Sequence, residues 1–278
     1  YVSGDNSMSE ISKSLPQLIF NSYVENPILD TQKNSYVALS AVCTKYYTVY
    51  LVLNPSNNNA FQLYFHNQFS SCFLNTYGRN PIALFGGSEN AASINSDGSI
   101  VAIVLDSEKK FPLADIMVLP ENEKASSVAC TNHFFIVLSM SGKLYHSSLK
   151  GKLSEVDELK GTKIVYISGT YYEAYAVSEK GQVFRFGNDM NNKFTLIHSL
   201  LEYKIDKVYA GSYHSFFLTS DGKLLGLGKN SHGELFINNN GHEIVIPTKI
   251  LMKEKVLFCC AGYDLSVIST NNLIRMSP

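Results

Sequence analysis

The sequence predicts an all-β protein, a β-propeller of six or seven four-stranded blades. Short apolar runs with alternating character are separated by glycine, asparagine and aspartate turn signals, as expected of antiparallel strands. Related segments also recur at intervals close to a propeller repeat, which spans about 40 to 50 residues with four strands. Each unit is too small to bury its apolar faces alone, so the repetition predicts a ring of stacked sheets.

The clearest unit covers residues 204–250. An apolar run reaches Gly211, and His214 follows three residues later. Asp221-Gly222 then marks a hairpin, because the turn needs a residue that accepts a positive φ. Pro247 lies in the last run, and proline is tolerated in an edge strand but not inside a sheet. The four expected strands are residues 208–210, 216–218, 223–228 and 244–250, with the last outermost.

The ends of the chain suggest how the ring closes. Residues 1–6 parallel the third strand of the clearest unit, and residues 15–19 parallel its fourth. We therefore expect one propeller domain over residues 1–278, in which residues 1–20 complete the last blade and residues 36–278 form the successive blades. Such pairing would remove exposed sheet edges. Residues 273–276 also resemble a third strand, so either they or residues 1–4 are surplus.

The remaining copies follow one another along the chain. One unit starts at Tyr36, and residues 87–98 align without a gap on residues 211–222. Copies at residues 127–142 and 165–181 each carry one extra residue before the turn glycine, and a last copy covers residues 256–277. One repeat position recurs at intervals of 44, 43, 39, 42 and 51 residues, at Tyr46, Asn90, His133, Tyr172, His214 and Leu265.

Composition excludes several classes of protein. The chain has 278 residues, of which 45% are hydrophobic and 17% charged, which indicates a globular protein. No apolar run is long enough to cross a bilayer, and the net charge of −1 argues against nucleic-acid binding. We expect an intracellular protein, cytoplasmic rather than nuclear, with free thiols. The five cysteines are Cys43, Cys72, Cys130, Cys259 and Cys260.

Three segments of the clearest unit carry a family resemblance. Residues 210–215 (AGSYHS), Asp221-Gly222 and residues 228–235 (GKNSHGEL) resemble the repeat of the regulator of chromosome condensation family. The resemblance extends over essentially the whole chain and implies a propeller, typically of seven blades. Two features depart from the family pattern: the chain has no tryptophan, and the histidine position is kept in only two copies.

The resemblance also implies a binding surface. In the founding member, the face that acts on a small nuclear GTPase is built from acidic and histidine residues in the short loops between first and second strands. Carried onto this sequence, the partner-binding residues are Glu89, Asn90, His133, Tyr171, Tyr172, Tyr213, His214 and Asp264. The alternative for His133 and His214 is structural: at a shared repeat position, each would bond the backbone of a neighbouring blade.

No residue pattern points to covalent chemistry. His214, His232 and His242 match no zinc-ligand spacing, and we expect neither a metal nor another cofactor. The leading hypothesis is a non-catalytic scaffold that binds another protein through the loops of one propeller face, as one module of a larger chain or assembly. The rival is a guanine nucleotide exchange factor for a small GTPase. Chromatin binding is less favoured, because acidic residues interrupt the basic stretch at residues 150–163.

Overall fold

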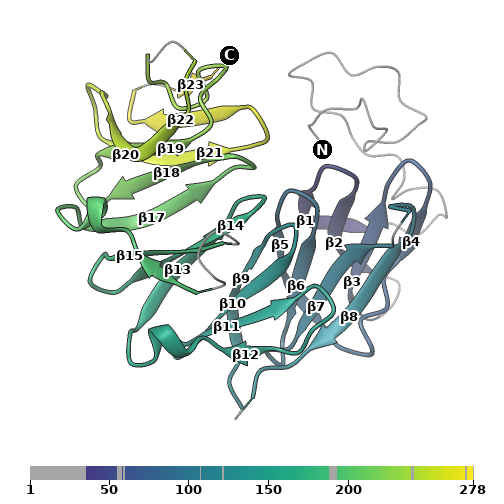
Figure 1. The fold of residues 1–278 in the computed structure, drawn as a ribbon. Coiled ribbons are helices and arrows are strands. Elements are labelled where there is room, and N and C mark those ends of the chain that lie inside the picture. Colours follow the sequence, from purple (N-terminus) through teal and green to yellow (C-terminus); the bar gives the residue numbers. More distant parts are fainter. Residues whose placement is uncertain are drawn as a thin grey trace. The chain divides into compact units, whose positions relative to one another are not determined.

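The computed structural model describes residues 36–277 apart from 55–57, 59, 107, 121, 188–192, 239–240 and 273. Within these residues the regular structure consists of six antiparallel sheets and two single-turn 3-10 helices, η2 (Asp157–Leu159) and η4 (His198–Leu200) (Figure 1). The all-β prediction is therefore confirmed. The chain divides into two compact units, residues 1–125 and 126–278.

The first unit contains two four-stranded sheets, in which sequential strands pair as neighbours. The strands of the first sheet are β1 (Val37–Cys43), β2 (Thr48–Asn54), β3 (Ala60–His66) and β4 (Ser71–Phe73). Those of the second are β5 (Pro81–Gly86), β6 (Ala91–Asn95), β7 (Ile100–Leu105) and β8 (Pro112–Met117). The two sheets share one core, in which the Tyr47 hydroxyl donates to the Ile103 carbonyl at 2.8 Å.

The second unit contains three four-stranded sheets and a last sheet of three described strands. The first comprises β9 (Ala125–Cys130), β10 (Phe134–Ser139), β11 (Leu144–Ser148) and β12 (Ser154–Glu155). The next comprises β13 (Ile164–Gly169), β14 (Glu173–Ser178), β15 (Val183–Gly187) and β16 (Thr195–Leu196). The third comprises β17 (Ile205–Ala210), β18 (His214–Thr219), β19 (Leu224–Gly228) and β20 (Ile244–Ile250). The last comprises β21 (Val256–Ala261), β22 (Ser266–Thr270) and β23 (Ile274–Met276).

The second strand of each sheet is buried along almost its whole length, on both faces. In β18, Phe216 and Phe217 are adjacent and both fully buried. Since successive strand residues point to opposite faces, they enter different cores. Phe217 packs with residues of the preceding sheet such as Tyr175, whereas Phe216 packs with residues of the following sheet such as Ile268. Each sheet of this unit thus covers an apolar face of the next.

The predicted turns and edges are present. Gly222 has φ +85° and Gly98 has φ +86°, at equivalent hairpin turns, so a left-handed residue is required at both. The strand that contains Pro247 is the outermost of its sheet, as predicted.

The third strand of the last sheet is β23, which pairs with β22. It therefore occupies the place for which residues 1–4 were an alternative. The proposed role of residues 1–20 lies outside the described residues. None of the five cysteines, all of which lie in the described part of the chain, forms a disulfide; Cys130 and Cys259 are buried, and Cys43 and Cys260 are exposed. Of the helices in the described part of the chain, none has the length and hydropathy to cross a membrane.

Candidate functional site at the loops between first and second strands

A four-residue turn joins the first strand to the second in each sheet of the second unit. Its first residue donates its N–H to the carbonyl of the fourth: Thr131 to Phe134 (3.1 Å), Thr170 to Glu173 (2.8 Å), Gly211 to His214 (2.8 Å) and Gly262 to Leu265 (2.8 Å). Threonine at the first position adds a second bond, since its hydroxyl accepts the N–H of the fourth residue. Hydrogen bonds within each turn therefore hold each of these loops closed.

These turns correct the repeat alignment. His214 is the fourth residue of its turn, whereas His133 is the third of its own, so the predicted equivalence of the two histidines is wrong by one residue. The structural counterpart of His214 is Phe134, and that of His133 is Tyr213. The third position is the outward one: His133 and Tyr172 are exposed and Tyr213 is half-buried, whereas His214 is buried.

Backbone hydrogen bonds tie the four loops into a row. Asn132 donates its N–H to the Tyr171 carbonyl, Tyr171 donates to Ser212, and Ser212 donates to Gly262, each at 2.9 Å. Close approach explains glycine at the first position of the third loop, because a Cβ on Gly211 would lie 2.5 Å from the Gly262 carbonyl oxygen. The loops of successive sheets are thus held in fixed register.

Aromatic side chains follow the same row and form a continuous strip, which we call the aromatic ladder. Its members are His133, Tyr171, Tyr172, Tyr213 and Tyr263. The centroids of consecutive rings lie 6.0 Å apart for His133 and Tyr172, 4.5 Å for Tyr172 and Tyr171, 5.5 Å for Tyr171 and Tyr213, and 5.3 Å for Tyr213 and Tyr263.

The ladder combines exposed ring surface with a protonated tyrosine hydroxyl at its centre. Tyr172 and Tyr263 each keep 47% of their surface exposed. Burial, followed by the hydrogen bond with Tyr263, raises the pKa of Tyr213 well above its usual range, so its hydroxyl stays neutral at physiological pH. The structure therefore brings His133, Tyr171, Tyr172 and Tyr213 together, all four of them partner-binding candidates from the sequence. Tyr263 completes the strip; its place beside Asp264 in the last loop was the sequence signal for it.

His214 has a structural position. It is 1% exposed, and its Nε2 lies 2.7 Å from the Ser266 hydroxyl of the following sheet. Burial lowers the pKa of this imidazole to about 4, an effect that outweighs the opposing charges of Glu234 and Asp264. The contact reaches a side chain of the next sheet, where the structural hypothesis expected backbone. A partner could not touch His214 without opening the interface between the two sheets.

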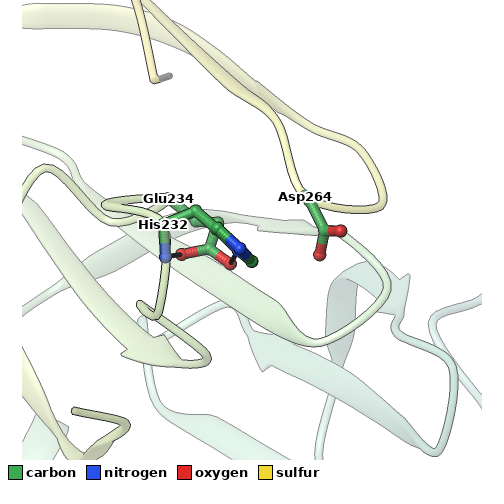
Figure 2. Close-up of side chains that lie close together, drawn as sticks. All are labelled: His232, Glu234 and Asp264. Carbon is green, nitrogen blue, oxygen red and sulfur yellow. Dashed lines mark hydrogen bonds and ion pairs between the residues drawn. The ribbon is translucent and has the colours of Figure 1, made fainter. Parts of the chain in front are cut away.

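Beside the ladder, four charged or titratable side chains link two sheets. Figure 2 shows His232 and Glu234 on the loop after β19, facing Asp264 on the loop after β21. Glu234 is fully buried, and its Oε2 accepts the His232 N–H at 2.8 Å. The Lys229 ammonium lies 2.7 Å from Asp264 Oδ1 and 3.6 Å from Glu234 Oε1. Lys229 thus carries the positive charge between the two carboxylates.

The ionisation of Glu234 follows from this setting. Burial alone would raise its pKa, but hydrogen bonds from its own N–H and from that of His232, together with the Lys229 charge, outweigh burial and lower it. His232, Glu234 and Asp264 each place a donor atom within 4.8 Å of the others, a set able to hold a cation. Because Lys229 already lies between the two carboxylates, we interpret the group as an ion-pair link between sheets. No sequence pattern indicated this ion-pair group, because its members lie on two loops that are separated in the chain and meet only in the folded structure.

In the first unit, the third residues of the equivalent turns contact a lysine of the chain. Tyr46 and Glu89 are the third residues of the turns in its two sheets, since Thr44 donates to Tyr47 and Gly87 to Asn90. Lys109 Nζ lies 4.0 Å from the centre of the Tyr46 ring and 2.9 Å from Glu89 Oε2. Glu89 and Asn90 are both buried, at 8% and 4% exposure. This loop position therefore holds a lysine between a tyrosine face and a carboxylate.

Comparison with known proteins adds two kinds of similarity. Residues 205–234 match the family model described as the Regulator of chromosome condensation (RCC1) repeat. The chain is 30% identical over 122 residues to a probable E3 ubiquitin-protein ligase, HERC4 of Rattus norvegicus, which covers 39% of this chain and 12% of the ligase. It is 29% identical over 126 residues to the secretion-regulating guanine nucleotide exchange factor of Bos taurus, covering 41% of this chain and 27% of that protein.

The fold is similar to that of solved structures. Prp20p of Saccharomyces cerevisiae, described together with its binding to Gsp1p and histones, superposes with a TM-score of 0.63 at 14% sequence identity. The match covers 84% of this chain and 68% of Prp20p. At such low identity the similarity shows the fold alone. The chain spans about an eighth of the length of HERC4 and about a quarter of the exchange factor.

Proposed function

We propose that this chain, a protein of the regulator of chromosome condensation repeat family, binds another protein through the aromatic ladder. The observation that carries the proposal is the unbroken strip of four tyrosines and one histidine across four successive loops. Tyrosine is enriched at the centres of protein interfaces, where its ring buries a large area and its hydroxyl finds a polar partner. Asp264, in the last of these four loops, extends the candidate set.

The rigidity of the loops supports the same proposal. Loop-to-loop hydrogen bonds hold the tyrosine backbones before any partner arrives. A surface that is ordered in advance loses less conformational entropy on binding. Tyrosine also has few rotatable bonds, so ordering its side chain costs little. The ladder therefore fits a scaffold role, in which the chain supplies a preformed surface and no covalent chemistry.

A site-specific crosslink tests the proposal. A photoreactive benzoylphenylalanine replaces Tyr172 in the ladder, and in a matched control it replaces Tyr77, which is 53% exposed and lies outside these loops. We expect a discrete crosslinked protein at position 172 in extracts of the source cells. Excess unlabelled chain should compete it away, and excess Tyr172→Leu chain should compete poorly. Equal crosslinking at both positions would contradict a specific ladder surface.

Guanine nucleotide exchange is the second candidate, supported by the similarity to the secretion-regulating exchange factor. Release of a fluorescent GDP analogue from a panel of small GTPases tests it directly. Acceleration that is lost in Tyr172→Ala and Asp264→Ala would replace the scaffold proposal by exchange activity. His214→Ala is unsuitable as a probe because the side chain is buried against Ser266.

Histone binding is a third candidate, suggested by the description of Prp20p. Two of the four lysines in the basic stretch at residues 150–163 are already paired with carboxylates. Lys160 pairs with Asp157 at 2.6 Å, and Lys163 pairs with Glu179 at 2.7 Å. We expect a histone pull-down at physiological salt to recover nothing, and recovery would favour chromatin binding.

For the architecture, we propose a ring closed by the N-terminal segment. The last described sheet has three strands, with β23 in the third position and an exposed outer edge in which Ile274 is 69% exposed. Residues 15–19 resemble the end of β20, the fourth strand of the preceding sheet. This supports a single domain in which that segment adds the fourth strand to the last blade. Whether the ring has six or seven blades depends on how residues 1–6 pair.

A further inference from the structure

Two of the four consecutive ring pairs in the aromatic ladder are nearly parallel, whereas Tyr171–Tyr172 and Tyr213–Tyr263 meet edge to face at 69° and 81°. His133 and Tyr172 are inclined by 23°, and Tyr171 and Tyr213 by 26°. An aromatic face is the negative end of the ring quadrupole and attracts a cation placed over it. The planar guanidinium of arginine can also stack on such a face, which an ammonium group cannot do.

The charges on the loops favour the same type of ligand. The four turns of the second unit, residues 131–134, 170–173, 211–214 and 262–265, contain two carboxylates and neither lysine nor arginine. Glu173 pairs with Arg185, and Asp264 shares Lys229 with the buried Glu234. When these pairs are counted together, one negative charge remains in excess beside the rings, which complements a cationic segment.

Both units of the chain place a lysine ammonium beside the third position of these turns. In the first unit, the third turn residues of two successive sheets are Tyr46 and Glu89, and together they hold the Lys109 ammonium. In the second unit, Tyr213 and Asp264 have the same relation in sequence, and Asp264 holds Lys229. The exposed third positions, His133 and Tyr172, are each followed by a tyrosine in the next sheet. One internal cation, Lys109, thus lies over the ring at this loop position, and both Lys109 and Lys229 pair with the carboxylate at the third turn position of the next sheet, an arrangement that binds a cation.

We propose that the exposed rings of Tyr172 and His133 bind an arginine side chain of an extended basic segment in the partner protein, with the guanidinium stacked on the tyrosine face. The inference rests on the proposed partner-binding function and specifies the chemistry of the partner. A proline-rich segment, which also docks on aromatic grooves, is an outcome that the test below separates from it.

Fluorescence anisotropy of short labelled peptides tests the proposal on the full chain. The probe is fluorescein-Gly-Ser-Arg-Ser-Arg-Ser-Gly, compared with the same peptide carrying citrulline, lysine or proline in place of arginine. Citrulline keeps the shape of arginine but removes the charge. We expect the arginine peptide to bind most tightly, with about a two- to fivefold loss for each ring removed from the stack. Equal or tighter binding of the citrulline, lysine or proline peptide would overturn the proposal, as would no binding of the arginine peptide.

Charge-neutral variants separate stacking from general attraction to an acidic protein. Tyr172→Leu removes the ring without altering the net charge and should weaken binding, whereas Tyr172→Phe retains the ring and should bind like wild type. Tyr77→Leu, at an exposed tyrosine outside the loops, is the matched control. Unchanged affinity in Tyr172→Leu would refute the assignment. If position 172 crosslinks a partner but the arginine peptide fails to bind, the partner-binding function stands and only its arginine chemistry is wrong.

Discussion

The Nε2 atom of His214 lies 2.7 Å from the Ser266 hydroxyl, a buried hydrogen bond that joins the second strands of two successive sheets. Neither residue is more than 1% exposed. Removing one partner leaves a buried polar group without its bond, which typically costs about 1 to 3 kcal/mol. We expect Ser266→Ala to lower the free energy of unfolding in urea by that amount. Ser220→Ala, at an exposed serine of the same unit, should change it little. Equal effects of the two substitutions would argue against the bond.

Stability should fall in mild acid because of His214. Its pKa is about 4 in the folded chain and about 6.5 when unfolded, so between these values the unfolded state binds more protons. The contribution of His214 is complete above pH 6.5 and is lost progressively as the pH falls toward 4. Between pH 7.5 and 5.0 the expected loss is about 2 kcal/mol.

Urea titrations of wild type and His214→Gln at the two pH values isolate this residue, because glutamine can still bond Ser266 but does not titrate. The loss of stability between the two pH values should be smaller in the variant. An identical loss in both proteins would show that other groups govern the acid response.

Lys229 should matter because Glu234 beside it is fully buried. Lys229→Met leaves that carboxylate without its cation. Breaking a buried pair costs about 3 to 5 kcal/mol, and we expect the lower end because Lys229 is about a third exposed. Adding Glu234→Gln removes the uncompensated charge and should recover much of the loss, so a double-mutant cycle by urea unfolding measures the coupling. Strictly additive effects would contradict it.

Gly211 tests how closely two loops of the ladder approach. A Cβ there would lie 2.5 Å from the Gly262 carbonyl oxygen, whereas the nearest atom to a Cβ on Gly262 would be the Leu265 carbonyl oxygen at 3.5 Å. Crowding of this kind typically costs about 1 to 3 kcal/mol. Gly211→Ala should therefore lower the melting temperature and weaken crosslinking from position 172, and Gly262→Ala should change both less. A larger effect from Gly262→Ala would be inconsistent with this geometry.

Ring closure by the N-terminal segment predicts protection of the outer edge of β23. Deleting residues 1–20 should accelerate amide hydrogen exchange in the last sheet, while the sheet of β13 to β16 keeps its protection. Exchange measured by mass spectrometry resolves the two regions. Unchanged exchange in residues 256–277 would show that the segment pairs elsewhere or not at all.

Several features of the fold could be predicted from local sequence because their causes are local. Asp221-Gly222 indicated a hairpin, since glycine is the residue that adopts φ +85° without strain. Pro247 indicated an edge strand, since proline has no N–H to donate. The recurrence of short units, each too small to bury its own apolar faces, indicated that successive sheets cover one another. The repeat of these signals was enough to predict an all-β protein with propeller-type sheets.

The alignment of the repeats from sequence contained an error of one residue, and its cause lies in the signal that was used. Matching His133 to His214 required one extra residue before the turn glycine. Matching Phe134 to His214 requires none, because each then lies eight positions before its turn glycine, Gly142 or Gly222. A shared side-chain type was a weaker guide than the spacing imposed by strand pairing. The misplaced register concealed that one histidine is exposed and the other is buried.

The amino-acid sequence by itself determined the strands, their turns and the order in which they pair, because those depend on neighbours within each unit. Only the tertiary structure decided that five aromatic rings form one strip and that Lys229, Glu234 and Asp264 meet. Those contacts join residues from successive sheets, and their geometry depends on how apolar faces pack, which no local pattern of residues encodes.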